Sequence, residues 1–79
     1  MGHTTSSLIQ MFHDRVGGSV SQFVLTAKQF QWLFDLAYRE DGFVPNGPTG
    51  RPHVQVVTPD AIYYVSQQRG GSAIVTVRV

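Results

Sequence analysis

Cysteine is absent from the 79 residues of this chain. Disulfides, thiolate metal sites and thiol nucleophiles are therefore excluded. Small secreted domains usually depend on disulfides, so the sequence favours a reducing compartment, and we expect the protein to be cytoplasmic. A chain this short forms one domain and is only marginally stable by itself. Oligomerisation is the common remaining stabiliser, so we expect a homo-oligomer or a bound protein partner.

Charged residues are also scarce, at 14% of the chain, whereas ordinary domains carry about 25%. The formal net charge is +1, and the six basic residues are spread evenly along the sequence. Dedicated nucleic-acid binders usually carry a clustered basic patch, so the composition disfavours that class. Five of the basic residues are arginine and one is lysine. This bias indicates a GC-rich genome and suits a small accessory protein of a bacterium or phage.

Long apolar runs are missing as well. No stretch approaches the roughly 20 apolar residues of a membrane-spanning helix, so we expect no membrane partner. The first seven residues lack the charged and apolar regions of a signal peptide. We therefore expect a disordered leader over residues 1–7 and a single domain over residues 8–79.

The clearest predicted element is a helix over residues 27–41. Thr26 and Gln29 form a capping box, in which each side chain accepts a hydrogen bond from the backbone N–H of the other residue. Gly42 stands where a C-terminal cap is expected. The residues predicted to be buried recur at helical spacing, at Phe30, Leu33, Phe34 and Ala37.

The apolar surface of this helix extends beyond that stripe, to Trp32 and Leu36 on one flank. Two interpretations are open. In the first, the N-terminal segment covers the flank. In the second, Trp32 and Leu36 contact another chain, because tryptophan anchors are enriched at protein interfaces.

Residues 8–16 fit two structures. The spacing of their apolar side chains favours a short helix that ends at Gly17. The same residues could instead form a strand that turns back into residues 20–25. That hairpin would pair Phe12 with Phe23.

The C-terminal third predicts a β-meander. A strand over residues 53–58 is followed by a turn at residues 58–61, and the face that this strand buries stays open. Two further strands are joined by a hairpin turn at Gly70-Gly71, since adjacent glycines supply the positive φ angles of tight turns.

The register of this last hairpin follows from its loop length. A two-residue Gly70-Gly71 loop places Ile62, Tyr64 and Ser66 on the core face, opposite the valines of the last strand. Tyr63 then lies beside Arg78 on the outer face of the predicted sheet. The predicted fold class is α+β: one central amphipathic helix packed on an antiparallel sheet of three or more strands, preceded by a short helix or hairpin.

Residues suited to catalysis or metal binding are not arranged for either task. No two acidic residues are predicted to share one cleft, as paired general acids and bases require. The three histidines are His3, His13 and His53, and their spacing does not match that of metal ligands. We expect His13 to lie at the surface or at a helix end. The sequence therefore predicts no enzyme activity, no cofactor and no metal.

The composition and the exposed apolar residues together predict a small non-enzymatic interaction module that binds a protein partner or itself. The predicted partner-binding residues are Trp32, Leu36, Phe43, Arg51 and His53. The alternative is a weak single-stranded nucleic-acid-binding protein that uses the outer sheet face and residues 42–53. In that case Tyr63 would stack on bases, and Arg69 and Arg78 would lie near phosphates.

Overall fold

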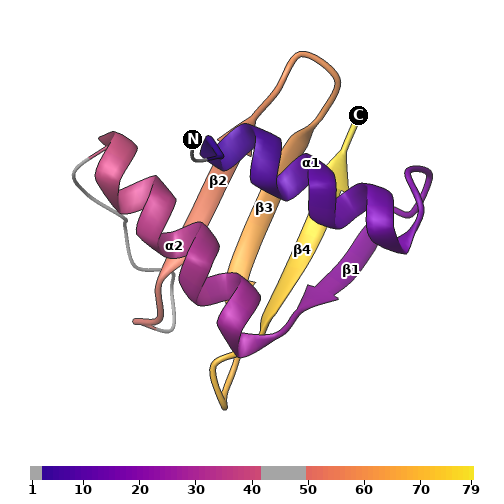
Figure 1. The fold of residues 1–79 in the computed structure, drawn as a ribbon. Coiled ribbons are helices and arrows are strands. Elements are labelled where there is room, and N and C mark those ends of the chain that lie inside the picture. The colour runs from indigo at the N-terminus through magenta and orange to yellow at the C-terminus, as the bar shows by residue number, and fades with distance from the viewer. Residues whose placement is uncertain (1–2, 42–49) are drawn as a thin grey trace.

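The computed structural model describes residues 3–41 and 50–79. Its elements in chain order are α1 (Thr5–Val16), β1 (Gln22–Leu25), α2 (Ala27–Asp41), β2 (His53–Val57), β3 (Ile62–Gln67) and β4 (Ala73–Arg78). Within these residues the strands form one antiparallel sheet in the order β1-β4-β3-β2. Both helices lie on the same side of that sheet (Figure 1). The predicted α+β class is therefore confirmed.

Helix α1 begins earlier than the predicted domain. The Thr4 side chain accepts a hydrogen bond from the Ser7 N–H at 3.1 Å, and Ser7 Oγ accepts one from the Thr4 N–H at 3.0 Å. This capping box satisfies two N–H groups at the helix start. Residues 5–7 are therefore helical, although the sequence placed them in a disordered leader. The helix ends as predicted at Gly17, whose φ of 123° favours glycine.

Each alternative for the N-terminal segment contained one correct element. Residues 8–16 are helical, because a helix buries Leu8, Ile9 and Phe12 against one layer, whereas a strand would place Leu8 and Ile9 on opposite faces. Residues 22–25 form a strand, but β1 pairs with β4 and not with residues 8–16. Phe23 consequently lies opposite Val75.

Helix α2 matches its predicted bounds. The Thr26 N–H donates to Gln29 Oε1 at 2.9 Å, and the Gln29 N–H donates to Thr26 Oγ1 at 3.1 Å, so the capping box is confirmed. The predicted stripe is buried at Phe30, Leu33 and Ala37 and partly buried at Phe34. Gly42, the predicted C-terminal cap, lies outside the described residues.

The predicted register of β3 against β4 is wrong by one residue. Gln67 pairs with Ala73, so five residues separate the paired strands instead of two. Within this loop the Gly71 N–H donates to the Gln68 carbonyl at 3.2 Å, and the Gln68 N–H donates to the Ser72 carbonyl at 2.7 Å. Gly70 and Gly71 have φ angles of 86° and 94°. The glycines therefore supply positive φ angles in a longer loop.

This shift turns β3 over, because neighbouring residues of a strand point to opposite faces. Tyr63 and Val65 face the helices and are buried, whereas Tyr64 and Ser66 face away from them. On β2, the alternating pattern buries Val54 and Val56.

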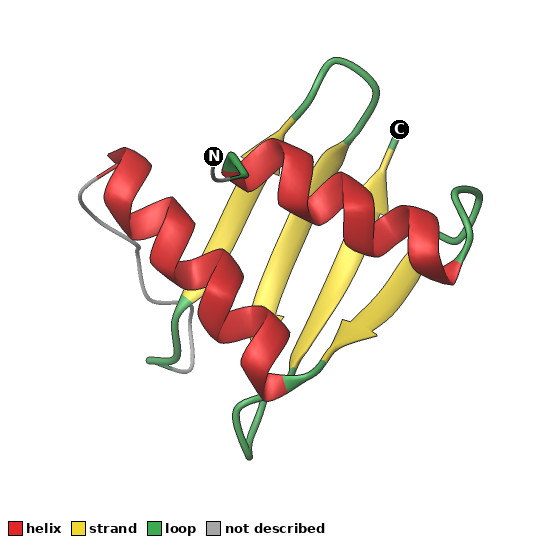
Figure 2. Cartoon of the chain, in the orientation of Figure 1, coloured by secondary structure: helices red, strands yellow, loops and turns green. Residues whose placement is uncertain are grey.

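The turn predicted at residues 58–61 is confirmed. The Thr58 N–H donates to the Ala61 carbonyl at 2.9 Å, and the Ala61 N–H donates to Thr58 Oγ1 at 3.0 Å. Within residues 3–41 and 50–79, the helices pack against one side of the sheet, as Figure 2 shows. No described helix is long and apolar enough to cross a membrane.

Candidate functional site

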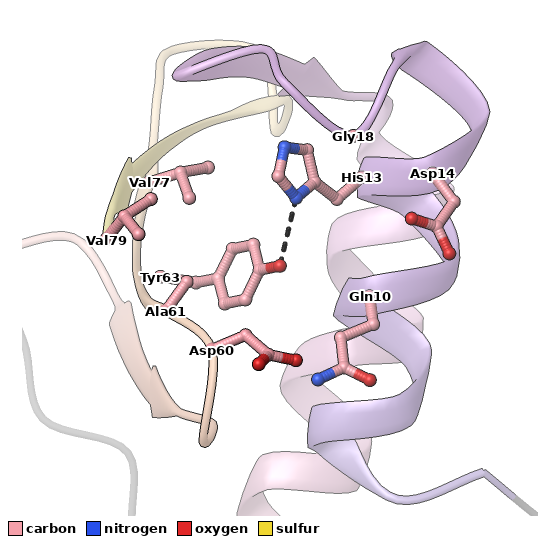
Figure 3. Close-up of a pocket in the computed structure, with 9 residues that line it drawn as sticks. All are labelled: Gln10, His13, Asp14, Gly18, Asp60, Ala61, Tyr63, Val77 and Val79. Carbon is pink, nitrogen blue, oxygen red and sulfur yellow. Dashed lines mark hydrogen bonds between the residues drawn. The ribbon is translucent and has the colours of Figure 1, made fainter.

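A buried histidine–tyrosine pair joins α1 to the sheet. His13, in the last turn of α1, is only 7% exposed and stacks on Phe23 with ring centroids 5.4 Å apart. Its Nε2 lies 2.7 Å from the Val20 carbonyl oxygen. A carbonyl can only accept, so Nε2 donates, and in a neutral imidazole Nδ1 is then the acceptor. The Tyr63 hydroxyl, 2.9 Å away, donates to Nδ1 (Figure 3).

A cavity of about 370 Å³ opens beside this pair. Its polar lining comes from Gln10 and Asp14 of α1 and from Asp60 in the turn between β2 and β3 (Figure 3). The pKa of Tyr63 is raised above 10.0, first by burial and then by the negative charges of Asp14 and Asp60. The Tyr63 phenol therefore keeps its proton at neutral pH, and it is not an activated nucleophile.

The pair is equally unsuited to bind a metal. Both ring nitrogens of His13 are engaged in hydrogen bonds, so neither is free to act as a ligand. Among the residues described, no three histidine, aspartate or glutamate side chains are grouped closely enough to hold an ion. The geometry is that of a structural polar link, which fixes α1 and the segment that follows it against the sheet.

The side of the sheet that faces away from the helices is a second candidate, which we call the open face. Its residues follow from the strand registers and the alternating burial, and they are Gln22 and Val24 of β1, His53, Gln55 and Val57 of β2, Ile62, Tyr64 and Ser66 of β3, and Ile74, Thr76 and Arg78 of β4.

The open face exposes apolar side chains without a covering layer in the described structure. Val24 and Val57 are 63% and 64% exposed, and Tyr64, on a central strand, is 36% exposed. Ile62 and Ile74 are partly buried. The face includes one arginine, Arg78, and no carboxylate. It is therefore a mixed surface of apolar, amide and hydroxyl groups.

No protein-family model, curated protein or solved structure matches this chain.

The N-terminal segment contacts the predicted partner-binding flank of α2 and covers part of it. The Trp32 ring meets Phe12 edge-on at 6.0 Å and His3 at 5.6 Å between centroids. The Thr5 N–H also donates to Glu40 Oε2 at 2.7 Å. Leu36 packs partly buried against the core. Trp32 nonetheless keeps 45% of its surface exposed.

The four predicted partner-binding residues that the structure describes do not form one surface. Trp32 and Leu36 lie in the helical layer, whereas His53 lies on the open face. Arg51 is partly buried just before β2, and Phe43 lies outside the described residues. Within the described residues, Nδ1 of His53 is buried without a hydrogen-bond partner.

The predicted nucleic-acid set is also divided. Arg78 is on the open face, and Arg69 is exposed in the loop between β3 and β4. The prediction that Tyr63 stacks on bases is wrong, because Tyr63 is 4% exposed and points to the helical side of the sheet. Tyr64 occupies the open face in its place. Sequence reasoning missed Val24, Val57 and Tyr64 as surface residues, and the alternation of β3 would have identified Tyr64 had the loop length been known.

Proposed function

We propose that this protein is a non-enzymatic interaction module that binds a protein partner through the open face of its sheet. The observation that carries the proposal is the exposure of Val24 and Val57, which are 63% and 64% accessible on a sheet face that no described helix covers. Apolar residues exposed on both edge strands of one sheet face favour a contact surface, because their burial against a partner removes apolar area from water.

The chemistry of the open face supports a protein partner. Charged residues are depleted in the centre of protein interfaces, while tyrosine is enriched there. Tyr64 lies on the central strand β3 and is flanked across the sheet by Gln55 and Thr76. The one arginine of the face, Arg78, lies opposite Ile62 near the end of β4. Little charge would therefore have to be desolvated at the centre of the contact.

The pocket beside α1 supports the non-enzymatic part of the proposal. Tyr63 is held neutral by burial and by two nearby carboxylates, and His13 uses both ring nitrogens in structural hydrogen bonds. Because its raised pKa keeps the phenol protonated at neutral pH, Tyr63 is not an activated nucleophile.

The absence of cysteine supports a reducing compartment, which we take to be the cytoplasm.

Capture from a native host lysate tests the proposal when it is done with a matched pair of variants. Val57→Glu places a charge on the open face, and Val16→Glu places the same charge on α1, where Val16 is 50% exposed. Both variants are first checked for an unchanged circular dichroism spectrum. We expect the native chain and Val16→Glu to capture the same identified protein in equal amounts after nuclease treatment. Val57→Glu should capture at least tenfold less of that protein.

Equal capture by the two variants would show that the open face is not the contact surface. Loss of all captured material on nuclease treatment would contradict a protein partner and would instead favour a nucleic acid. In that case the binding should also weaken steeply with salt, because phosphate contacts release counterions.

A further inference from the structure

The hydrogen bonds of His13 fit a neutral ring, and the same partners can also hold a charged one. Nε2 lies 2.7 Å from the Val20 carbonyl oxygen, which can only accept, so Nε2 carries a proton in either state. Nδ1 lies 2.9 Å from the Tyr63 hydroxyl, and a phenol can both donate and accept. The direction of this second hydrogen bond therefore depends on whether Nδ1 carries a proton.

We propose that protonation of His13 reverses its hydrogen bond with Tyr63, so that the pair is a pH-sensitive switch. In the neutral state the Tyr63 O–H donates to Nδ1. When Nδ1 takes a proton from solvent, the new N–H donates to the phenol oxygen, and the Tyr63 O–H turns to another acceptor. The pair lies on the helical side of the sheet, so the inference does not depend on the proposed role of the open face.

The cavity beside the pair supplies the other acceptor. Tyr63 lines this cavity together with Gln10, Asp14 and Asp60 (Figure 3). An amide or carboxylate oxygen of these residues accepts the Tyr63 O–H directly or through a bridging water. The phenol oxygen offers a lone pair to the cavity in the neutral state and a proton in the charged state. Acidification therefore changes this part of the cavity wall from a hydrogen-bond acceptor into a donor.

The groups that face His13 bear on the cost of its charge. His13 is 7% exposed, and burial disfavours a charged ring. It lies in the last turn of α1, where the free carbonyls at the helix end attract a positive charge. Asp14 and Asp60 line the same cavity, and their carboxylates also attract it. Phe23, which stacks on the imidazole, is uncharged. Arg15 shares the last turn of α1, but it is exposed, so water screens its repulsion.

The pH dependence of Tyr63→Phe tests the reversal. In this variant Nδ1–H of a charged His13 has no acceptor, so the folded chain resists the proton that an unfolded histidine binds below about pH 6.5. The folded state then binds fewer protons than the unfolded state, and the free energy of unfolding falls on acidification. Urea unfolding measures this effect. We expect the unfolding equilibrium constant of the variant, relative to that of the native chain, to rise about tenfold from pH 8 to pH 5.

Tyr64→Phe is the matched control, because it removes the same hydroxyl from a residue on the other side of the sheet. Its unfolding constant relative to the native chain should not change between pH 8 and pH 5. His3 and His53 are present in every variant, so their titration cancels in these ratios. A ratio for Tyr63→Phe that stays constant or falls toward pH 5 would overturn the reversal, because a hydroxyl that only donates cannot serve a charged ring.

NMR of the imidazole nitrogens of the native chain is a second measurement, and it needs no variant. At pH 8 we expect His13 to carry a proton on Nε2 and none on Nδ1. At pH 5 both nitrogens should carry protons, while the amide signals of α1 remain those of a helix. A folded chain in which His13 stays neutral at pH 5, or a loss of α1 as His13 becomes charged, would contradict the proposed switch.

Discussion

The hydrogen bond between His13 and Tyr63 links helix α1 to the sheet at the scale of single residues. It joins positions 50 residues apart in sequence, and it is buried on both sides. A buried acceptor without a donor costs free energy, because it has lost its hydrogen bond to water. The sequence placed His13 at the surface or at a helix end, and only the second part of that prediction is correct. Nothing in the sequence near His13 identifies a partner that distant.

Tyr63→Phe is expected to lower the free energy of unfolding by about 1–3 kcal/mol, because it leaves Nδ1 of His13 buried without a donor. Urea unfolding measures the change. Tyr64→Phe is the matched control, since it removes the same hydroxyl from a residue on the open face, and it should cost less than about 0.5 kcal/mol. Equal losses in the two variants would contradict the structural role of the pair.

The raised pKa of Tyr63 also predicts how stability depends on pH. The folded protein holds this proton above pH 10.0, where the unfolded chain releases it. The folded state then binds more protons, so the free energy of unfolding falls as the pH rises above 10.0 toward the folded pKa. Below pH 10.0 this contribution is fully present. Unfolding curves of the native chain and Tyr63→Phe should therefore converge at alkaline pH, and a constant difference would contradict the assignment.

At the scale of elements, the local signals in the sequence were sufficient for α2 and insufficient for the sheet register. The bounds of α2 follow from Thr26, Gln29 and the apolar spacing, all of which lie within the helix or next to it. The β3–β4 register depends on the loop length. The glycines Gly70 and Gly71 are compatible with a two-residue loop and with a five-residue loop. The hydrogen bonds of Gln68 in the structure show that the longer loop forms.

Thr26→Ala should lower the free energy of unfolding by about 1 kcal/mol, because the Gln29 N–H loses its acceptor at the start of α2. Thermal or urea unfolding measures this loss. Thr26→Ser keeps a hydroxyl at the same position, so it should recover most of the stability. A serine variant as unstable as the alanine variant would indicate that packing of the Thr26 methyl group, and not capping, is responsible.

Gly71 should tolerate substitution less well than Gly70. Both have positive φ angles, but a Cβ at Gly71 would lie 3.2 Å from Cβ of Ala27, whereas a Cβ at Gly70 meets nothing within 4 Å in the described structure. Gly70→Ala should therefore cost about 1–2 kcal/mol of stability from backbone strain, and Gly71→Ala should cost more. The reverse order in unfolding experiments would contradict the loop conformation.

The whole molecule has two unlike sides. The helical side contains the core and the His13–Tyr63 hydrogen bond. On this side Phe12 and His3 pack against the ring of Trp32. The other side is the open face. The sequence predicted exposed apolar surface on α2, where Trp32 is 45% exposed, and it did not predict the exposed residues of the open face. Val24, Val57 and Tyr64 could not be placed correctly, because their orientation depends on strand pairings between distant segments.

The most direct test of a contact at the open face is NMR of the isotope-labelled native chain, recorded alone and after addition of the protein that it captures from the lysate. The methyl signals of Val24 and Val57 and the ring signals of Tyr64 should shift together. Signals of Val16 and Tyr38, which are exposed on the helices, should stay constant. Unchanged signals from the open face, or shifts confined to Val16 and Tyr38, would contradict the open face as the contact surface.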